Sequence, residues 1–383
     1  MLCLLFADSR ATRQNKRNPP MNDPLQKAWT RVTRQLADAG RRIDRLTEGR
    51  GPQERAEGYR FLTRVLSAMA TFQVEQSPEL PGFEQVMSPT RKFYVDNPDT
   101  LYHRASLNPR LGYRVRGRRG DALYLAFCVY GANRILANLH DEDMVFDADG
   151  RFELILSPAR PAGAVNWLLL PIGARTLITR QYFTRRDRLP AELEIELLDP
   201  RAPSTAPTEP AMAARLIGLG EGVARTLQVT ERASTAWLER PNEITIDSAD
   251  DDLAALFATP DNHYLGGWYR LAEDEMLVME GRAPACRYWS VQLCSRWLES
   301  HDYRNRQVIL NHEQVELTPD GTFRIVVAGR DPGVPSWLDT GGGREGGVIF
   351  RWLLPRGKIP RPAFYVEKSE NETEKRTIDT LYG

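Results

Sequence analysis

The chain contains one stretch twice, and this internal repeat restricts the folds that the sequence can adopt. The first copy, Asp149 to Leu168, reads DGRFELILSPARPAGAVNWL, and the second, Asp320 to Leu338, reads DGTFRIVVAGRDPGVPSWL. In each copy Asp-Gly favours a tight turn, and the apolar residues that follow alternate with the period of two expected of a half-buried strand. The repeat therefore predicts two β domains built on one plan.

Shorter matches on both sides extend the repeat. Tyr124-Leu-Ala-Phe-Cys-Val129 corresponds to Tyr288-Trp-Ser-Val-Gln-Leu293, and Ile178-Thr179-Arg180 corresponds to Ile349-Phe350-Arg351. The offset between the copies is 164 residues before the central stretch and 170 to 171 residues after it, so one short insertion separates otherwise parallel units.

Each unit contains short apolar segments separated by Gly, Pro, Asn and Asp, the pattern of an antiparallel sandwich or jelly roll. The predicted fold class is mainly β with accessory helices (α+β), with two repeated antiparallel β-sandwich or jelly-roll domains plus an N-terminal αα-hairpin. We expect residues 113–183 and 277–352 to share one strand order, with Trp167 and Trp337 on equivalent strands.

Six segments are expected along the chain. Apolar residues three and four apart predict hairpin helices at 24–46 and 53–72 and a further helix at 211–238, and the acidic run DSADDD favours the start of a short helix at 253–258. The expected segments are a disordered tail (1–23), the helical hairpin (24–85), a first β-sandwich domain (86–200), a linker and helix (201–250), a second β-sandwich or jelly-roll domain (251–366) and a C-terminal tail (367–383).

Composition excludes several classes of partner. The chain has 51 Lys and Arg residues and 51 Asp and Glu residues, so it has no overall charge to attract nucleic acid or an anionic membrane. No apolar run reaches the length that a membrane-spanning helix needs. Cys286 and Cys294 stand eight residues apart on one predicted strand, too far for a disulfide, and no signal peptide is recognisable, so we expect a cytoplasmic protein.

The sequence also lacks the usual signatures of metal and cofactor sites. The five histidines never stand two or four residues apart, and no zinc or facial-triad spacing occurs. Gly341 to Gly343 are not followed by the Lys and Ser or Thr of a phosphate-binding loop, and no Gly-X-Ser-X-Gly elbow is present. We therefore expect no metal and no cofactor.

Polar residues stand beside aromatic residues in three loops, the first at 97–104, the second at 330–340 and the third at 261–264, a composition common at sites for polar small molecules. Structural roles are the alternative, because Asp99 can cap the Asn-Pro-Asp turn and Arg330 can pair with Asp331 beside a packed Trp. The candidate proton-transfer groups are Asp99, His103, Asp331 and Asp339, and the candidate ligand-binding residues are Asn97, Tyr102, Arg330, Trp337, Thr340, Arg351 and His263.

Three segments of the chain resemble known bacterial families. Asn97-Pro-Asp-Thr-Leu-Tyr102, Arg287-Tyr-Trp-Ser-Val-Gln-Leu293 and Asp331-Pro-Gly-Val-Pro-Ser-Trp-Leu-Asp-Thr340 resemble domain of unknown function 1254 (N-terminal) and domain of unknown function 1214 (C-terminal). The likeness to the second family spans about 255–355, and the likeness to the first spans little beyond 95–130.

The resemblance implies a fold and no established activity. Relatives look like paired β-sandwich and jelly-roll domains, in agreement with the internal repeat. They tend to have Asn before the Trp and His after the glycine, where this chain has Ser336 and Gly343.

Two functions fit the candidate residues. The first is a metal-independent acid–base enzyme acting on a small polar or amphipathic molecule in a cleft between the β domains, with Arg330 positioning an anionic or carbonyl oxygen. The alternative is a non-catalytic ligand- or partner-binding β-sandwich protein. Both imply a small-molecule partner and leave homo-oligomer formation open. Because polar residues surround Trp337 but not Trp167, the site is expected in the C-terminal copy.

Overall fold

The computed structural model describes residues 23–132, 134–200, 208–249 and 259–368. The predictions that fall outside the described residues are the N-terminal tail up to residue 22, the linker at 201–207, the short helix at 253–258 and the tail from residue 369.

The first β domain is a sandwich of two sheets. Its five-stranded sheet has the order β1-β2-β8-β4-β5 and its four-stranded sheet the order β7-β6-β3-β9, with β6 and β7 as the parallel pair. The strands are β1 (Glu84–Gln85), β2 (Thr100–Ser106), β3 (Tyr113–Arg118), β4 (Tyr124–Tyr130), β5 (Ile135–His140), β6 (Arg151–Ser157), β7 (Asn166–Leu169), β8 (Thr176–Tyr182) and β9 (Glu192–Leu197).

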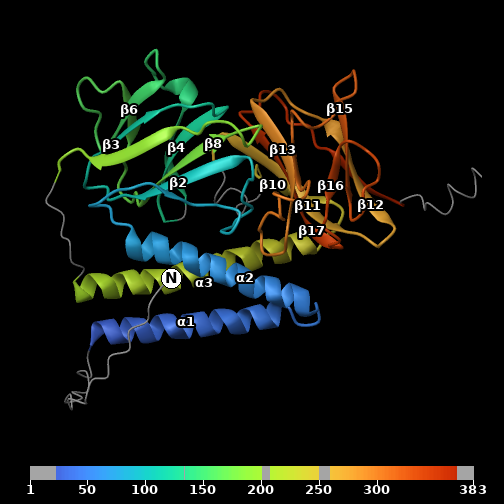
Figure 1. Cartoon of the computed structure of the whole chain (residues 1–383), viewed down its shortest axis with the longest axis horizontal. Helices are drawn as coiled ribbons and strands as arrows, with labels where there is room; N and C mark the ends of the chain where they lie inside the picture. The colour runs from blue at the N-terminus through green and yellow to red at the C-terminus, as the bar shows by residue number, and fades with distance from the viewer. Residues whose placement is uncertain (1–22, 133, 201–207, 250–258, 369–383) are drawn as a thin grey trace, which may run out of the picture.

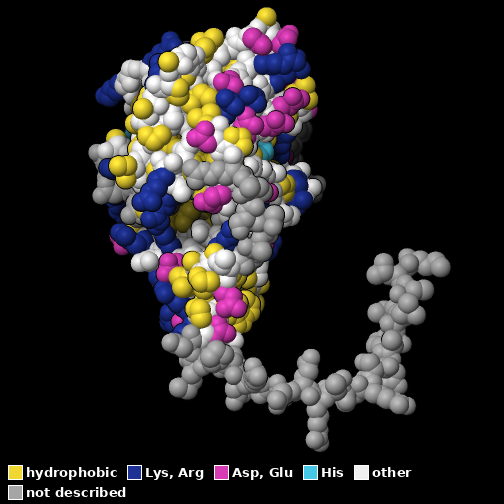
Figure 2. Space-filling model, turned by 90° about the vertical axis from the view of Figure 1, so that its left-hand side faces the viewer, with side chains coloured by type: hydrophobic (Ala, Val, Ile, Leu, Met, Phe, Trp, Pro, Cys, Tyr) yellow, Lys and Arg dark blue, Asp and Glu magenta, His cyan; other side chains and the backbone are white. Residues whose placement is uncertain are grey.

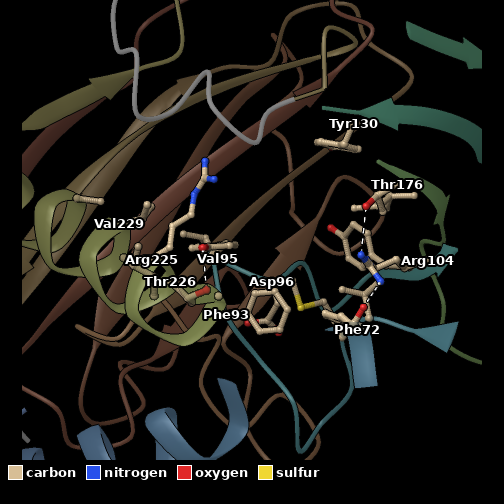
Figure 3. A pocket seen from close by; sticks show the side chains of 18 of the residues that line it. Phe72, Phe93, Val95, Asp96, Arg104, Tyr130, Thr176, Arg225, Thr226 and Val229 are labelled. Carbon is tan, nitrogen blue, oxygen red and sulfur yellow. Dashed lines mark hydrogen bonds between the residues drawn. The ribbon is translucent and has the colours of Figure 1, made fainter. Parts of the chain in front are cut away.

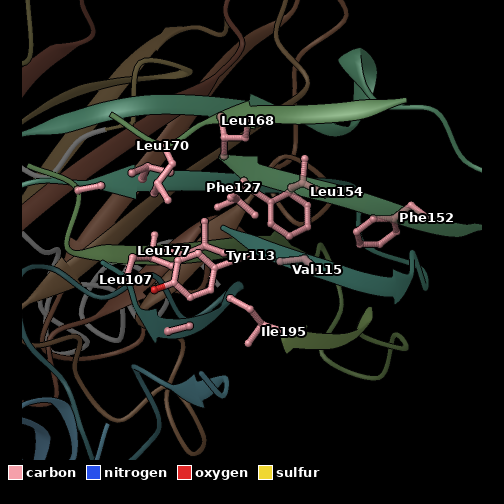
Figure 4. Close-up of a cluster of buried hydrophobic side chains, with 14 of the residues drawn as sticks. Leu107, Tyr113, Val115, Phe127, Phe152, Leu154, Leu168, Leu170, Leu177 and Ile195 are labelled. Atoms are coloured by element: carbon pink, nitrogen blue, oxygen red, sulfur yellow. The ribbon is translucent and has the colours of Figure 1, made fainter. Parts of the chain in front are cut away.

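The core of this domain lies between its two sheets (Figure 4). Phe127 and Leu177 from the five-stranded sheet pack with Tyr113 and Leu154 from the four-stranded sheet, and all four side chains are fully buried. Because successive side chains of a strand point to opposite faces, the neighbours of Leu177 on β8 point away from this core. The outer face of the five-stranded sheet is therefore free to form contacts with the rest of the molecule.

The second β domain repeats this plan strand for strand. Its sheets have the orders β10-β11-β17-β13-β14 and β16-β15-β12-β18, again with one parallel pair, β15 and β16. The predicted fold class of two repeated β domains is thus confirmed. The strands are β10 (Ile244–Asp247), β11 (Asn262–Arg270), β12 (Glu275–Arg282), β13 (Tyr288–Cys294), β14 (Ile309–Asn311), β15 (Thr322–Ala328), β16 (Trp337–Asp339), β17 (Glu345–Leu353) and β18 (Ala363–Lys368).

The two tryptophans of the repeated stretch occupy equivalent places. Trp167 on β7 lies opposite Ile155, and Trp337 on β16 lies opposite Val326, each in a parallel pairing. Both indoles are half-buried, and each donates its ring N–H within its own domain, Trp167 to Ser157 Oγ at 3.0 Å and Trp337 to a backbone carbonyl at 3.2 Å. The expected equivalence of the tryptophans is confirmed.

Three helices form a layer beneath both β domains (Figure 1), namely α1 (Pro24–Leu46), α2 (Pro52–Met69) and α3 (Glu209–Leu238). The side chain of Asp23 caps α1 by accepting the N–H of Leu25 at 2.8 Å. Helix α3 packs against both α1 and α2, and Phe61 of α2 stacks on Trp297 of the second β domain. The N-terminal hairpin of α1 and α2 therefore packs with a third helix, α3, and the three helices together underlie both β domains. None of the described helices is long and apolar enough to cross a membrane.

The two β domains meet through a reciprocal pair of hydrogen bonds. Tyr288 Oη donates to Asp99 Oδ2 at 3.0 Å, and Tyr124 Oη donates to Asp261 Oδ2. Asp99 and Asp261 directly precede the equivalent strands β2 and β11, and the tyrosines begin the equivalent strands β4 and β13. Because each repeat contributes one tyrosine and one aspartate, at equivalent positions, to this pair of hydrogen bonds, an approximate twofold axis relates the two repeats.

Candidate functional site

A largely apolar cavity of about 370 Å³ lies where the two five-stranded sheets meet the helices (Figure 3). We call it the central cavity, and its volume is typical of small-molecule sites. Helix α2 continues into a short π-helix, η1 (Ala70–Glu75), which contributes Phe72 and Gln73 to the wall, and π-helical turns are frequent at functional sites. The main apolar side chains of the central cavity are Met69, Phe72, Val86, Phe93, Ile178, Val229, Leu298 and Ile349.

Each repeat contributes the same pair of side chains to the wall of the central cavity. Tyr102 on β2 lies directly opposite Arg180 on β8, and Tyr264 on β11 lies directly opposite Arg351 on β17. In both pairs the guanidinium carbon lies 5.8 Å from the centre of the tyrosine ring. At this distance the ring attracts the cation and helps to fix its orientation.

Arg351 is held by uncharged groups. One guanidinium nitrogen donates to Gln292 Oε1 at 2.6 Å, the other donates to the carbonyl oxygen of Val95 at 2.5 Å, and the side chain forms no ion pair with a carboxylate of the described residues. The residue is 2% exposed. Burial opposes the charge, but the surrounding tyrosine oxygens, those of Tyr264 and Tyr102 foremost, raise the pKa of Arg351. A buried cation without a counter-charge favours an anion beside it.

The equivalent side chain, Arg180, is held in a related way. It donates to Cys128 Sγ at 3.1 Å and to Tyr130 Oη at 2.5 Å. Cys128 occupies the position in β4 that Gln292 occupies in β13, so the two repeats use the same strand position to orient the two arginines. Burial raises the pKa of both Cys128 and Tyr130, which keeps the thiol and the phenol protonated.

A third arginine breaks the symmetry of the central cavity. Arg104 on β2 donates to Thr176 Oγ1 at 3.2 Å, to the carbonyl oxygen of Phe72 at 3.4 Å and to Gln76 Oε1, and burial lowers the pKa of Arg104 to about 10. The equivalent residue of β11 is Gly266, where a Cβ atom would collide with a backbone oxygen of β17. Figure 3 shows Arg104 and Arg225 on opposite sides of the central cavity.

Asp96 supplies the one carboxylate that lines the central cavity among the described residues. Its two oxygens accept the backbone N–H of Ser300 at 2.8 Å and the hydroxyl of Ser300 at 2.7 Å, and burial raises its pKa. The described part of the chain contains no group of three or more His, Cys, Asp or Glu side chains placed to hold a metal ion.

The sequence-predicted residues of the first loop divide between the central cavity and the domain interface. Tyr102 lines the central cavity, as does Arg351 from the second repeat. Asn97 and Asp99 lie in the interface, where Asn97 Oδ1 accepts the backbone N–H of Asp99 at 3.1 Å and Asp99 Oδ2 also accepts from Asn311 Nδ2 at 2.8 Å. Burial raises the pKa of Asp99, and its hydrogen bonds only partly offset this effect.

The two predicted histidines lie outside the lining of the central cavity, one strand position away from its tyrosines. His103 packs against Phe83 with 6.4 Å between ring centres, and burial lowers its pKa. His263 Nε2 lies 3.0 Å from Asp247 Oδ1. Since neighbouring residues of a strand face opposite ways, placing Tyr102 and Tyr264 in the wall turns both histidines away from it.

The predicted residues of the second loop form hydrogen bonds within the loop and ion pairs with neighbouring residues. Arg330 forms an exposed ion pair with Glu273, and Asp331 accepts the backbone N–H of Gly333 at 2.8 Å. Asp339 accepts the backbone N–H of Gly341 at 2.6 Å and pairs with Arg306 at 2.9 Å. None of the loop residues Arg330, Asp331, Trp337, Asp339 and Thr340, all of them described, lines the central cavity, and Thr340 faces a separate cavity near α2. The four candidate proton-transfer groups are therefore not brought together there.

Several residues of the central cavity were not selected from the sequence. The signal for Arg180 was present, because the repeat matches it with Arg351. Tyr264 carries a similar signal once the strands are paired, since it stands opposite Arg351 as Tyr102 stands opposite Arg180. The sequence contains no such signal for Asp96 and Arg104, because their place in the wall depends on the contact between the β domains and the helices.

The protein thus belongs to a class in which two β-sandwich repeats and a helical layer enclose a largely apolar cavity with arginine side chains in its wall. Residues 126–186 and 264–357 match the model of the family described as "Protein of unknown function (DUF1214)". The match confirms the resemblance expected for the C-terminal half, and its first part lies in the other repeat. Arg180 and Arg351 both fall within the matched residues. The likeness of the N-terminal half to domain of unknown function 1254 stays a prediction.

Two solved structures are similar to the chain. A crystal structure of an uncharacterised protein from Burkholderia cenocepacia has a TM-score of 0.85 and 29% identity, covering 90% of this chain and 98% of that chain. The crystal structure of the VPA0106 protein from Vibrio parahaemolyticus has a TM-score of 0.49 and 14% identity, covering 81% of this chain and 98% of that chain. No curated protein matches the chain.

Proposed function

We propose that the protein binds a small amphipathic anion, such as a monocarboxylate with an alkyl body, in the central cavity. The observation that carries the proposal is the convergence of two equivalent pairs on one cavity, Tyr102 with the buried Arg180 and Tyr264 with the buried Arg351. A guanidinium group presents parallel N–H donors that match the two oxygens of a carboxylate.

The charge of the wall favours an anion. Arg351 and Arg104 line the central cavity, and neither forms an ion pair with a carboxylate of the described residues. Arg351 and Arg104 bond to amide, carbonyl and hydroxyl oxygens, so a ligand carboxylate would supply the counter-charge that the described protein groups do not. Burying an uncompensated charge is costly, and its neutralisation by a ligand would add to the binding free energy.

The remaining wall favours an apolar body on the same ligand. Phe72, Phe93 and Ile349 offer aromatic and branched surface, and burial of apolar ligand area stabilises a complex by about 25 cal/mol per Å². The face drawn in Figure 2 is also hollowed at mid-height, where hydrophobic side chains lie beside Lys and Arg side chains. An amphipathic molecule satisfies both kinds of group at once.

The test measures displacement of the fluorescent amphipathic anion 1-anilinonaphthalene-8-sulfonate from the full-length protein. Octanoate should displace the dye, and octanol, which has the same alkyl chain without the charge, should be about tenfold weaker or more, the effect of one charge-assisted hydrogen bond. Equal potency of octanoate and octanol would argue against a site for anions.

Matched variants separate the roles of charge and space. Arg351→Gln should remove the preference for octanoate over octanol, and Val229→Phe should reduce binding of both by filling the central cavity without altering a charged group. Arg330→Gln makes the same change of charge at an exposed residue and should have no effect. If Val229→Phe folds and binds as the unaltered protein does, the ligand lies elsewhere.

A catalytic role for the same cavity would rest on Asp96, whose raised pKa makes it a candidate proton donor or acceptor. Asp96→Asn is nearly isosteric, so it should preserve octanoate binding. In an enzyme it would abolish turnover of the bound compound, and in a binding protein it would change nothing further. Product analysis with the bound compound distinguishes the two.

A further inference from the structure

We propose that a second cavity, between α2 and the second β domain, binds the phosphate ester of a polyhydroxy compound. It has a volume of about 740 Å³ and lies apart from the central cavity. Its wall is formed by α2, by the chain that follows β13 and by the glycine-rich turn after β16. Figure 1 shows α2 running beneath both β domains, and its first turns form this wall.

The wall of the second cavity is polar and carries an excess of positive charge. Among the described residues it includes eight Arg or Lys side chains and five Asp or Glu side chains; Arg306 and Arg344 pair with Asp339 and Glu273 outside the wall, so the formal excess is one positive charge. Several cations are already engaged by the protein, since Arg64 pairs with Glu299 at 2.9 Å and Lys92 Nζ donates to the carbonyl oxygens of Ser300 and His301. These contacts fix the chain after β13 against the helices, so the remaining donors are held in place.

Four buried polar atoms of this wall have no hydrogen-bond partner in the described part of the chain; three are donors, and the fourth is a histidine ring nitrogen that donates in one tautomer. They belong to side chains from three different segments of the wall. Thr340 and Trp268 are 3% and 1% exposed, so water outside the molecule does not satisfy them. The four atoms are Arg296 Nη1, His301 Nε2, Thr340 Oγ1 and Trp268 Nε1.

The geometry of the donors favours a phosphate group over a carboxylate. A planar carboxylate accepts in one plane, whereas a phosphate monoester presents three terminal oxygens and takes donors from several sides. Gly341 and Gly342 have φ values of 68° and 82°, which only glycine adopts without strain, and this turn brings Thr340 to the wall. The turn lacks the sequence of a phosphate-binding loop, so the side chains carry the proposed contacts.

The acidic groups of the same wall indicate the rest of the ligand. Glu54 Oε1 is buried and has no hydrogen-bond partner among the described residues. A carboxylate repels phosphate but accepts hydrogen bonds from hydroxyl groups. A ligand with a phosphate at one end and several hydroxyls at the other therefore suits the donors and the acceptor together, and the polar wall offers little to an alkyl chain.

The experiment is isothermal titration calorimetry of the full-length protein with glucose 6-phosphate, inorganic phosphate and glucose, at constant ionic strength in chloride. Glucose 6-phosphate should bind, inorganic phosphate should bind more weakly, and glucose should give no measurable heat. If neither phosphate compound gives more heat than chloride, the proposal is wrong.

Variants locate the binding. Arg296→Gln and Thr340→Val should each weaken glucose 6-phosphate by about tenfold or more, the effect of one charge-assisted hydrogen bond, and Arg296→Lys should retain most of the affinity. Glu54→Gln should weaken glucose 6-phosphate without weakening inorganic phosphate, because the substitution removes an acceptor for hydroxyl groups and a charge that repels phosphate. Arg330→Gln, with the same loss of charge outside the cavity, should have no effect; a loss equal to that of Arg296→Gln would show general charge attraction and overturn the proposal. Should Arg296→Gln not fold, Thr340→Val with Thr340→Ser as its control carries the same comparison.

Discussion

Asp99 accepts a hydrogen bond from Tyr288 of the other repeat, with 3.0 Å between the oxygen atoms. The equivalent bond runs the opposite way across the molecule, from Tyr124 to Asp261. Tyr288 and Tyr124 are fully buried and Asp99 is nearly so, whereas Asp261 is partly exposed, so water is excluded more completely from the bond to Asp99. Asp99, a candidate catalytic group in the sequence, here has a clear structural role at the interface.

Tyr288→Phe should lower the free energy of unfolding by about 1–3 kcal/mol, because it leaves the buried Asp99 carboxylate with one donor fewer. Tyr124→Phe should have a smaller effect, because Asp261 is partly exposed and keeps the hydrogen bond from Asn138. The control is Tyr59→Phe, which removes a hydrogen bond to Asp44 at an exposed position and should change the free energy by less than about 0.5 kcal/mol. Urea denaturation measures all three, and an equal effect of Tyr59→Phe would show that burial of the pair is unimportant.

Stability should fall as the pH rises from about 4.5 to 7, with Glu299 as one cause. Burial raises the pKa of Glu299 from its ordinary value of 4.5 to about 7, although Arg64 opposes the shift. Between these values the folded chain binds more protons than the unfolded chain, so the free energy of unfolding decreases with pH. Relative to Glu299→Gln, the unaltered protein should lose about 1–3 kcal/mol over this window. Urea denaturation at several pH values tests this, and parallel curves for the two proteins would contradict it.

Leu168→Ala and Leu338→Ala should each lower the free energy of unfolding by about 2–5 kcal/mol, the usual cost of emptying a buried leucine site. The two residues are equivalent in the repeat and are 4% and 0% exposed. Leu169→Ala is the matched control, since Leu169 neighbours Leu168 on β7 but is 39% exposed, and it should cost less than about 1 kcal/mol. A mild effect at Leu338 with a severe one at Leu168 would mean that the two cores are not equivalent.

Asp339→Asn should cost about 1 kcal/mol of stability and leave binding of 1-anilinonaphthalene-8-sulfonate unchanged. The side chain caps the turn at Gly341 and pairs with Arg306, so the substitution weakens an ion pair at the surface of the turn. Melting temperature and dye titration on one sample give both quantities. Loss of dye binding without a change in melting temperature would contradict this structural role and support Asp339 as a functional residue.

The repeat made the fold predictable. Its period-two strands and the match of Trp167 with Trp337 indicated two equivalent sandwiches before any contact was known. The helical spacing likewise anticipated α1, α2 and α3. What the sequence does not reveal is that these helices cover both domains, since an apolar helix face shows that a helix is buried and not against which partner.

The residues of the central cavity were harder to predict, because the composition of the loops drew attention to other residues. Polar residues around Trp337 suggested a site in the C-terminal copy, yet Asp331 and Arg330 satisfy their own turn and a surface ion pair. The stronger indication was an arginine retained at one position of two otherwise diverged strands, Arg180 and Arg351. A charged residue in a buried strand must be stabilised by its surroundings. Its presence at the same position of both repeats is therefore stronger evidence of a shared role than the composition of an exposed polar loop.

The replacement of Arg104 by Gly266 in the second repeat has a consequence for recognition. Two identical halves around an axis would present the same groups to both ends of a bound molecule, so a ligand could enter in either direction with equal affinity. Here the wall position that Arg104 occupies in the first repeat is bare backbone at Gly266 in the second repeat, and Arg225 on the opposite side belongs to α3, which the repeat does not duplicate. The single chain thereby gives the cavity a head and a tail, and a ligand with one charged end would be held in one orientation.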